Sequence, residues 1–435
     1  MSLFSWFKKS ANTNQITTTE QLAGVYGYND GEILFGSYRS HKVSPDRAYL
    51  CYEKVSVIYD AVDKIARRVS GLTIVSKNKA GEIGESELSK LLNAPSSETT
   101  KSELMSDLAT SLELTSEAWV VARGNINRIP LEIVSIKPYH VEGSFTNKGK
   151  LPDLIRTKSP LDEREYKKNI IKGVTRYIDE KGLNELIPII AKTYRNDWRG
   201  LSKLSPLVQE VGHIDSGNVH NTSMLSNGLN PSMVLTPAEG DIDLPQGEKI
   251  KEALRRHHAG SGNAGKALIL PNKMVLVSQS GTNKDMDYIQ LIDVDETRVY
   301  RLFNIPLPIV KSSSMTQSNY SAAIPFFYSE AVFPAFEYIA EQLTLKLGRR
   351  SKIDGETLTY DEFSIPALKE HQVGIMKELR GTNSFTTNEI RSNGGYAKDE
   401  SPMADKIIIS SSDISLDTLE MEKSFGNFEE NEDEE

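Results

Sequence analysis

The sequence predicts an α+β fold, and three observations lead to this prediction. Helical segments with apolar residues at regular spacings occupy much of the stretch from residue 53 to residue 116. A group of short, apolar, strand-like segments follows between residues 118 and 193. The stretch Asp285–Leu347 then has the pattern of a helix, a short loop and a second helix. Helices and strands are thus both expected.

The first half of the chain begins with residues 1–50, which are polar and in places rich in glycine, and which we expect to form an extended arm. The first strong helix is Glu53–Ser70, where Gly71 marks its end. Its apolar stripe consists of Val55, Ile58, Val62, Ile65 and Val69. Further helices are predicted at Ser86–Leu92 and Ser102–Ser116. Strands are predicted at Leu72–Val75, Ala118–Ala122, Leu131–Ile136, Asp153–Thr157, Thr175–Ile178 and Ile187–Thr193.

A helix over Leu207–Asn227 is predicted next, because Ser205 can cap it and Pro206 suits the first helical position. Gly228 fits its C-terminal cap. Its apolar stripe is weak, so this helix either packs against copies of itself or faces water around much of its circumference. Residues 230–283 then form a compact insert. Its expected elements are a strand at Ser232–Thr236, a helix at Gln246–His258, and a pair of strands at Ala267–Leu270 and Met274–Val277.

The helix Asp285–Phe303 is expected to stop at Asn304–Pro308, because proline cannot continue a helix. A polar, flexible loop, Ile309–Asn319, follows, and then an apolar helix to Leu347. We expect Pro334 to kink this second helix through loss of a hydrogen bond and a ring clash. A strand around Thr357–Ile365 and helical segments at Ala367–Leu379 and Phe385–Arg391 complete the ordered part. From Ser410 the chain is acidic and expected to be disordered.

Composition places the chain among ordinary globular proteins, with 38% hydrophobic and 26% charged residues. The single cysteine, Cys51, cannot form an intramolecular disulfide. We find no apolar run long enough to span a bilayer and no signal-peptide core, so synthesis in the cytosol is expected. Of the net charge of −9, the stretch Glu420–Glu435 carries −7. A nearly neutral body excludes a typical basic, tightly binding nucleic-acid domain.

One motif imitates a phosphate-binding loop. Gly260–Lys266 matches its first seven positions, but Ala267 stands where a Ser or Thr is needed for magnesium. The expected order of elements is also inverted, since a helix precedes the loop and a strand follows it. A flexible loop is therefore the preferred interpretation.

No catalytic or metal-binding constellation is apparent in the sequence. His257 and His258 are adjacent and would point about 100° apart on a helix, and no paired cysteine spacing is present. The carboxylate pairs Asp241/Asp243 and Asp293/Asp295 are expected to lie on solvated faces. The sequence predicts a non-enzymatic protein without cofactor or metal.

Two basic features are candidates for binding. The insert has a basic surface that is either a solvated helix face or a docking surface, and its residues are Lys249, Lys251, Arg255, Arg256 and Lys266. Lys311 is the only charged residue between Asn304 and Ser329. In a ring of copies it would form a collar of positive charge that contacts phosphates weakly and without sequence preference.

Seven short stretches, in order, resemble portal proteins of tailed double-stranded DNA bacteriophages of the Hong Kong 97-like type. They are Leu91-Leu-Asn-Ala-Pro95, Trp198-Arg-Gly-Leu-Ser-Lys-Leu-Ser-Pro-Leu207, Ser226-Asn-Gly-Leu-Asn-Pro-Ser-Met-Val-Leu235, Asn263-Ala-Gly-Lys266, Phe303-Asn-Ile-Pro306, Ser318-Asn-Tyr320 and Thr387-Asn-Glu-Ile-Arg391. Two family glycines are replaced. Ser116-Glu-Ala-Trp119 stands where the family has Gly-Asn-Ala-Tyr. Asn304 stands where the family has a glycine after Phe303, and asparagine is one of the few other residues that tolerate positive φ.

The resemblance implies a portal fold in a ring, usually a dodecamer, at one capsid vertex. Its parts would be an N-terminal arm (1–50), an α/β wing (51–204), a first stem helix (205–229), a small α/β clip (230–283) and a second stem helix (284–304). A tunnel loop (305–320), a kinked long wing helix with a wing strand (321–365), a helical crown (366–409) and an acidic disordered tail (410–435) would follow. The tunnel-loop residues facing DNA would be Lys311, Ser312, Ser313, Ser314, Thr316, Gln317 and Asn319. Helices would be interrupted at Pro306, Pro308 and Pro334.

The implied function is a channel for DNA packaging by the terminase motor, head–tail joining and DNA ejection. The implied partners are further copies of the chain, the terminase large subunit, a head–tail adaptor, the major capsid protein and scaffold, and double-stranded DNA. The implied location is the virion, after synthesis in the bacterial cytoplasm. Two alternatives remain: another structural head protein, such as an adaptor or minor capsid protein, which would show no ring with a central hole, and a nucleotide-binding enzyme using Gly260–Lys266, which would bind ATP.

Overall fold

The computed structural model combines helices and sheets, as the sequence predicts, and it describes residues 43–79, 83–145, 151–171, 174–191, 198–227, 233–237, 274–278, 282–311, 316–350, 356–382 and 384–407. Two compact units are present. The first unit is drawn from residues 1–66, 106–123 and 134–305, and the second unit from residues 67–105, 124–133 and 306–435.

The first secondary-structure element of the described residues is a helix. Helix α2 spans Pro45–Lys54, so the predicted extended arm is wrong from residue 45 onward, while residues 1–42 lie outside the described residues. Pro45 occupies the first helical turn, where its missing N–H costs nothing. Val55 adopts an extended conformation (φ −108°, ψ 107°) and separates α2 from α3, Ser56–Ser70. The predicted apolar stripe from Val55 to Val69 is buried throughout.

A seven-stranded sheet dominates the first unit, with the order β4-β3-β9-β8-β7-β6-β5. Every strand pair whose register is given is antiparallel. The strands are β3 Glu117–Arg123, β4 Glu132–Ile136, β5 Val141–Ser144, β6 Leu154–Thr157, β7 Glu165–Ile171, β8 Val174–Asp179 and β9 Asn184–Ile190. Strands β5 and β7 were not predicted. In β7 only Tyr166 is buried, so its sequence lacks the alternation of a half-buried strand.

The sheet is strongly curled. Its two edge strands, β4 and β5, follow each other in the chain and are joined only through the short 3-10 helix Pro138–His140. The concave side encloses a core to which each of the seven strands contributes: Trp119, Val121, Ile136, Val141, Ile155, Tyr166, Tyr177 and Leu186. Helix α5, Lys101–Thr115, precedes β3 and matches the prediction within one residue at each end.

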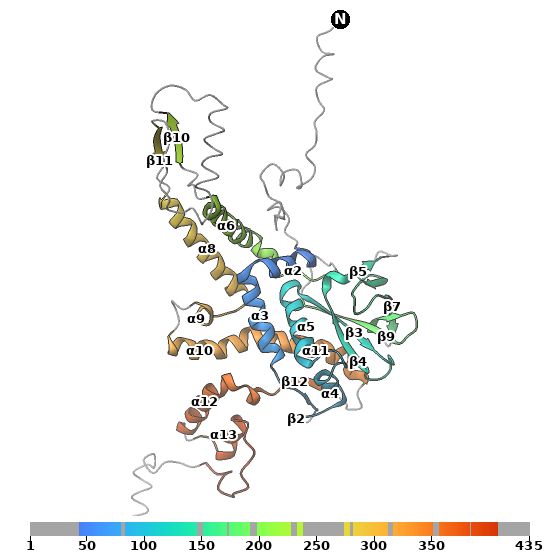
Figure 1. Ribbon diagram of the computed structural model, residues 1–435. Coiled ribbons are helices and arrows are strands. Elements are labelled where there is room, and N and C mark those ends of the chain that lie inside the picture. Colours follow the sequence, from blue (N-terminus) through green and yellow to red (C-terminus); the bar gives the residue numbers. More distant parts are fainter. Residues whose placement is uncertain are drawn as a thin grey trace, which may run out of the picture. The chain divides into compact units, whose positions relative to one another are not determined.

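Two long helices complete the first unit and run side by side (Figure 1). Helix α6 spans Val208–Asn227 and follows a 3-10 turn, Ser205–Leu207; helix α8 spans Thr282–Leu302. Ser205 is not the predicted cap, because its hydroxyl accepts a hydrogen bond from the Val43 N–H at 3.3 Å. Strand β11, Met274–Ser278, pairs with β10, Met233–Pro237. The predicted segments at 246–258 and 267–270 lie outside the described residues.

The second unit has a small sheet, β12-β1-β2, and mainly helices. Its strands are β1 Ile74–Lys77, β2 Ile83–Gly84 and β12 Thr357–Tyr360, so the predicted strand at 357–365 ends five residues early, before a 3-10 turn at Glu362–Ser364. The helices are α4 Glu87–Asn93, α9 Leu307–Val310, α10 Gln317–Phe327, a π-helical turn Tyr328–Val332, α11 Phe333–Leu347, α12 Lys369–Gly381 and α13 Thr387–Asn393.

Candidate functional site

A buried carboxylate connects the two long helices of the first unit. The side chain of Asp295 on α8 is 0% exposed and lies 2.9 Å from Nδ1 of His213 on α6. Arg298, one turn further along α8, donates to the same carboxylate at 3.0 Å. The guanidinium also lies 3.6 Å from Glu210 of α6. The helix pair is therefore fixed by charge-assisted contacts as well as by apolar packing.

This network corrects one sequence expectation. Asp295 was expected to share a solvated face with Asp293, but only Asp293 is exposed. The residues that bind Asp295 lie three positions away on the same helix and 82 positions away on another. Only the i, i+3 spacing to Arg298 could have been noticed from the sequence. The distant partner His213 carries no local signal.

Helix α8 ends through a backbone motif at the position where the sequence predicts a break. Asn304 has φ 55°. The N–H of Ile305 donates to the carbonyl of Tyr300 at 2.9 Å, and the N–H of Asn304 donates to that of Arg301 at 3.2 Å. These two bonds define a Schellman cap with asparagine in the left-handed position. The helix thus ends before Pro306 is reached, and the tolerance of Asn304 for positive φ is confirmed.

The segment Trp198–Leu207 anchors the start of α6 to the sheet. Arg199, 14% exposed, lies 2.5 Å from the fully buried carboxylate of Glu117 on β3. Its guanidinium also donates to the carbonyls of Val141 at 2.6 Å and Pro138 at 2.8 Å. Burial raises the pKa of Glu117, an effect opposed by Arg199 and by a hydrogen bond from the N–H of Gly200. The anchor therefore depends on a compensated charge inside the protein.

Close backbone packing completes this anchor. A Cβ at Gly200 would clash with the carbonyl oxygen of Thr115, so only glycine fits. Ser202 donates to the carbonyl of Leu114 at 2.7 Å, and Lys203 lies 2.5 Å from Glu113. Ser116, at the turn between α5 and β3, has φ 54°, so this serine adopts the conformation that a glycine would adopt without strain. The N–H of Ser116 closes the helix by donating to Leu112 at 2.9 Å.

The predicted tunnel loop is shorter than expected. Residues Leu307–Val310 form helix α9, with Pro306 before it and Pro308 in its first turn. Lys311 is half-buried directly after α9, and its N–H donates to the Leu307 carbonyl at 2.8 Å. Ser312, Ser313 and Ser314 lie outside the described residues.

The other end of this loop is already helical. Thr316 caps α10 by accepting a hydrogen bond from the Asn319 N–H at 3.2 Å. Gln317 and Asn319 therefore belong to the first turn of α10 and not to the loop, and both are exposed. The sequence did not predict that α10 begins here, because Thr316 is one polar residue among several and does not stand out as a helix cap.

The long helical stretch from Gln317 to Leu347 departs from α geometry ahead of Pro334. Pro325 lies inside α10, and Pro334 lies in the first turn of α11. Between them, Tyr328–Val332 form a π-helical turn in which the Phe333 N–H donates to the Tyr328 carbonyl. The irregularity predicted at Pro334 thus takes the form of a wider turn preceding it.

Several expectations concern parts of the chain that the structure leaves undescribed. The candidate docking residues Lys249, Lys251, Arg255, Arg256 and Lys266 all lie outside the described residues, as do Gly260–Lys266 and the acidic tail. Within the described ranges, no group of three or more metal-binding side chains comes together. No helix in those ranges has the length and apolar character needed to cross a membrane.

Comparison with known proteins gives a consistent result. The family model described as phage portal protein matches residues 56–394. An uncharacterized protein of Rickettsia bellii is 24% identical to the chain, and the match covers 84% of this chain and 92% of that protein. An uncharacterized protein of Rickettsia felis is also 24% identical, and the match covers 83% of this chain and 90% of that protein.

Solved structures share the fold. A chain from the neck of an empty gene transfer agent particle matches with a TM-score of 0.58 and 17% identity, covering 84% of this chain and 97% of that one. A chain from the neck of the native particle matches with a TM-score of 0.55 and 18% identity, over 83% and 95%. An HK97 family phage portal protein from Corynebacterium diphtheriae matches with a TM-score of 0.50 and 12% identity, over 74% and 98%.

Proposed function

The chain belongs to the phage portal protein family, and on that premise we propose that it assembles into a ring at one vertex of a capsid and forms the channel for DNA. The neck of the native gene transfer agent particle was computed with C12 symmetry, which supports a ring of twelve copies. Helices α6 and α8 would form the stem. The observation that carries this proposal is the polar network around Asp295, because it fixes the two helices proposed as the stem to each other.

The remaining parts take their roles from their order along the chain. Strands β10 and β11 would lie at the base of the clip, where the terminase large subunit and later a head–tail adaptor dock. The major capsid protein and scaffold would surround the ring. The completed protein would reside in the virion after synthesis in the bacterial cytoplasm.

The DNA-facing part would be the segment that follows α9. From residue 312 to residue 329 the chain has no charged side chain, so Lys311 is the one charge preceding a long neutral stretch. Each tight phosphate contact would add a barrier to sliding, and a ring with one lysine per subunit keeps the attraction weak and dependent on salt. Lys311 would therefore guide DNA without gripping it.

Charge reversal at Lys311 tests this role. We expect Lys311→Glu to form normal rings by electron microscopy but to package less DNA, with the deficit larger at low salt. Lys90→Glu is the matched control, because Lys90 is exposed on α4, where it forms an ion pair with the exposed Glu85 at 3.7 Å. Full packaging by the Lys311 variant would refute the DNA contact. Absence of rings from the unaltered chain would refute the portal assignment itself.

A further inference from the structure

The end of helix α8 is held from two sides within the first unit. Phe303, which directly follows the helix, is buried. Tyr300 donates a hydrogen bond to the carboxylate of Asp60 on α3 at 3.0 Å, and Asp60 also pairs with Lys64 of the same helix. From another direction, Nζ of Lys203 lies over the Phe303 ring, 5.8 Å from its centre. The helix end is therefore fixed by polar side chains as well as by apolar packing.

Lys203 connects the Phe303 ring to helix α5. Its ammonium group lies 2.5 Å from the carboxylate of Glu113, whose side chain is 4% exposed, whereas the lysine side chain is 32% exposed. An ammonium group within about 6 Å of an aromatic face is attracted by the ring, and the attraction is stronger where water is excluded. One side chain thus contacts a buried carboxylate on α5 and a buried ring at the end of α8.

The backbone on both sides of Lys203 is fixed. The hydroxyl of Ser202 donates to the carbonyl of Leu114, next to Glu113 on α5, at 2.7 Å. The N–H of Leu204 donates to the Ser202 hydroxyl at 3.1 Å, and the Leu204 side chain is fully buried. Since the backbone is already ordered, holding the lysine in place costs only the entropy of its side chain.

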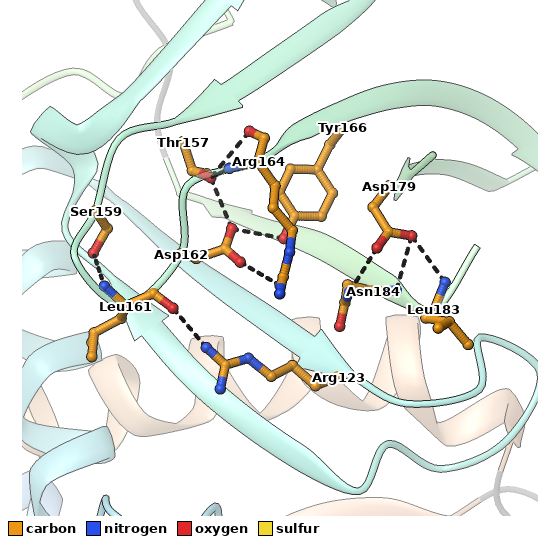
Figure 2. Close-up of polar contacts among 10 residues, drawn as sticks. All are labelled: Arg123, Thr157, Ser159, Leu161, Asp162, Arg164, Tyr166, Asp179, Leu183 and Asn184. Carbon is orange, nitrogen blue, oxygen red and sulfur yellow. Dashed lines mark hydrogen bonds and ion pairs between the residues drawn. The ribbon is translucent and has the colours of Figure 1, made fainter. Parts of the chain in front are cut away.

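Helix α5 is a firm support for Glu113, because it leads directly into β3, and β3 is fixed at both ends. At the start of the strand, Glu117 is bound to Arg199. At its end, Arg123 donates to the Leu161 carbonyl at 2.6 Å, and Figure 2 shows Arg123 reaching toward Leu161 from its own strand. Movement of β3 along the sheet would break these contacts.

The turn that receives Arg123 is itself held by buried polar contacts (Figure 2). The carboxylate of Asp162 is fully buried and accepts hydrogen bonds from Thr157 and Tyr166, both at 2.8 Å. Arg164 pairs with the same carboxylate at 2.6 Å. Because a buried carboxylate with three partners has one favoured position, β3 ends on a fixed point.

No long linker separates the end of α8 from the segment proposed to face DNA. Ile305 is buried, and its N–H is taken up by the cap of α8. Pro306 follows, with its φ restricted by the ring, and α9 begins at the next residue. Lys311 comes directly after α9. The end of α8 is therefore the point from which the segment that contains Lys311 starts.

We propose that Lys203 is a positioning residue for that segment: by tying the Phe303 ring to Glu113, it keeps the end of α8 in the same place in every copy of the ring. The proposal rests on the proposed portal function and adds a residue that does not itself touch DNA. In a symmetric ring, the Lys311 side chains form an even collar only if each copy presents its lysine in the same way. A loose end of α8 would make that collar uneven.

Two variants separate positioning from simple charge compensation. Lys203→Ala leaves Glu113 buried without a counter-charge, so it should lower the Tm. Lys203→Ala/Glu113→Leu removes both charges and should recover most of the Tm, because apolar replacement of a buried ion pair is often neutral. In this double variant we still expect hydrogen exchange at the amides of Phe303, Asn304 and Ile305 to be about tenfold faster. Its rings should form normally but package about threefold less DNA, because the link to the Phe303 ring is absent.

Two further variants serve as controls. Lys203→Arg keeps a cation that can pair with Glu113 and lie over the ring, so exchange and packaging should return to those of the unaltered chain. Lys168→Ala is the matched control, because Lys168 is 25% exposed and lies 3.8 Å from Asp153. It belongs to β7, which β8 and β9 separate from β3. This control should change neither exchange at the end of α8 nor packaging.

Each other result overturns the proposal. Unchanged exchange at the end of α8 in the double variant would mean that Lys203 only compensates the charge of Glu113. Faster exchange with full packaging would mean that DNA passage does not depend on this helix end. If the Tm of the double variant stays low, Lys203→Ala/Glu113→Gln decides by the same two measurements. Absence of rings from the unaltered chain would overturn the portal function, whereas the exchange measurement would still show whether Lys203 holds the end of α8.

Discussion

Replacing Arg199 by methionine removes the counter-charge of Glu117 from the anchor between the sheet and α6. The Glu117 side chain is 0% exposed, and Arg199 is only 14% exposed. Without the guanidinium, the carboxylate keeps the N–H of Gly200 at 2.7 Å as its remaining close donor outside its own strand. Breaking a buried ion pair in this way costs about 3–5 kcal/mol. We therefore expect Tm to fall by roughly 10 °C.

The same substitution should make stability depend on pH in a specific direction. Burial already raises the pKa of Glu117 above its ordinary value of 4.5, and Arg199 opposes that rise. Without Arg199 the folded state binds a proton on Glu117 more tightly than the unfolded state does. Stability of the variant then falls as pH rises through the window between 4.5 and the raised pKa. The deficit should be greatest near neutral pH and smaller at about pH 5.

Thermal unfolding at both pH values measures this effect, together with two companion variants. Arg156→Met removes an arginine that is 53% exposed and pairs with Glu165, and it should leave Tm unchanged. Glu117→Gln/Arg199→Met removes the unpaired charge, so it should recover part of the loss at neutral pH. A deficit that is independent of pH, or an equal loss from Arg156→Met, would refute the role of the buried charge.

Two further predictions concern the stem and the turn before β3. Asp295→Ala should destabilise the helix pair by about 1–3 kcal/mol, because its partners His213 and Arg298 are partly exposed and can be resolvated. Hydrogen exchange should then accelerate in α6 and α8 but not in β3 and β9, and the exposed Asp293→Ala should have little effect. Ser116→Gly should raise stability by about 0.5–1 kcal/mol in urea unfolding, because relief of left-handed strain exceeds the entropy that glycine adds to the unfolded chain. Ser116→Ala keeps the Cβ, and a similar gain from it would contradict this reasoning.

The spacing of apolar residues predicted these helices well, because the apolar stripe of each helix faces a continuous core. The predicted stripe of α3 is buried throughout, and α5 matches its prediction within one residue at each end. The helix predicted at Ser86–Leu92 is also present as α4, where Ser86 and Ser89 bond reciprocally at its start. In these cases the information is local, since each residue's neighbours in the helix decide its conformation.

The candidate site was less predictable because its contacts join residues far apart in the chain. His213 and Asp295 are 82 positions apart, and Gly200 and Glu117 are 83 apart. The i, i+3 spacing to Arg298 is the one local sign that distinguishes Asp295 from the exposed Asp293. Strand β7 was missed for a related reason: it is defined by pairing with β6 and β8, and its own residues are mostly polar.

The two replaced family glycines indicate what is required at those positions. Ser116 and Asn304 both have φ near +55°, and each donates its own backbone N–H to a carbonyl of the helix that it closes. The backbone conformation is therefore kept although glycine is not. At Asn304 an amide side chain tolerates that conformation with little strain, whereas serine at 116 does so at a cost that surrounding contacts must offset.

The distribution of charge along the chain fits the proposed role as a DNA channel. The buried carboxylates of Asp295, Glu117 and Asp162 each have an arginine partner, and they lie within the helix pair, at the anchor of α6 and at the far end of the sheet. Breaking any of these contacts leaves a charge without compensation, so they resist displacement of one element against another. The stretch 312–329 has no charged side chain. Strong electrostatic contacts are thus used inside the protein, where stiffness is required, and are absent from the sequence of the segment proposed to face moving DNA, where each would slow its passage.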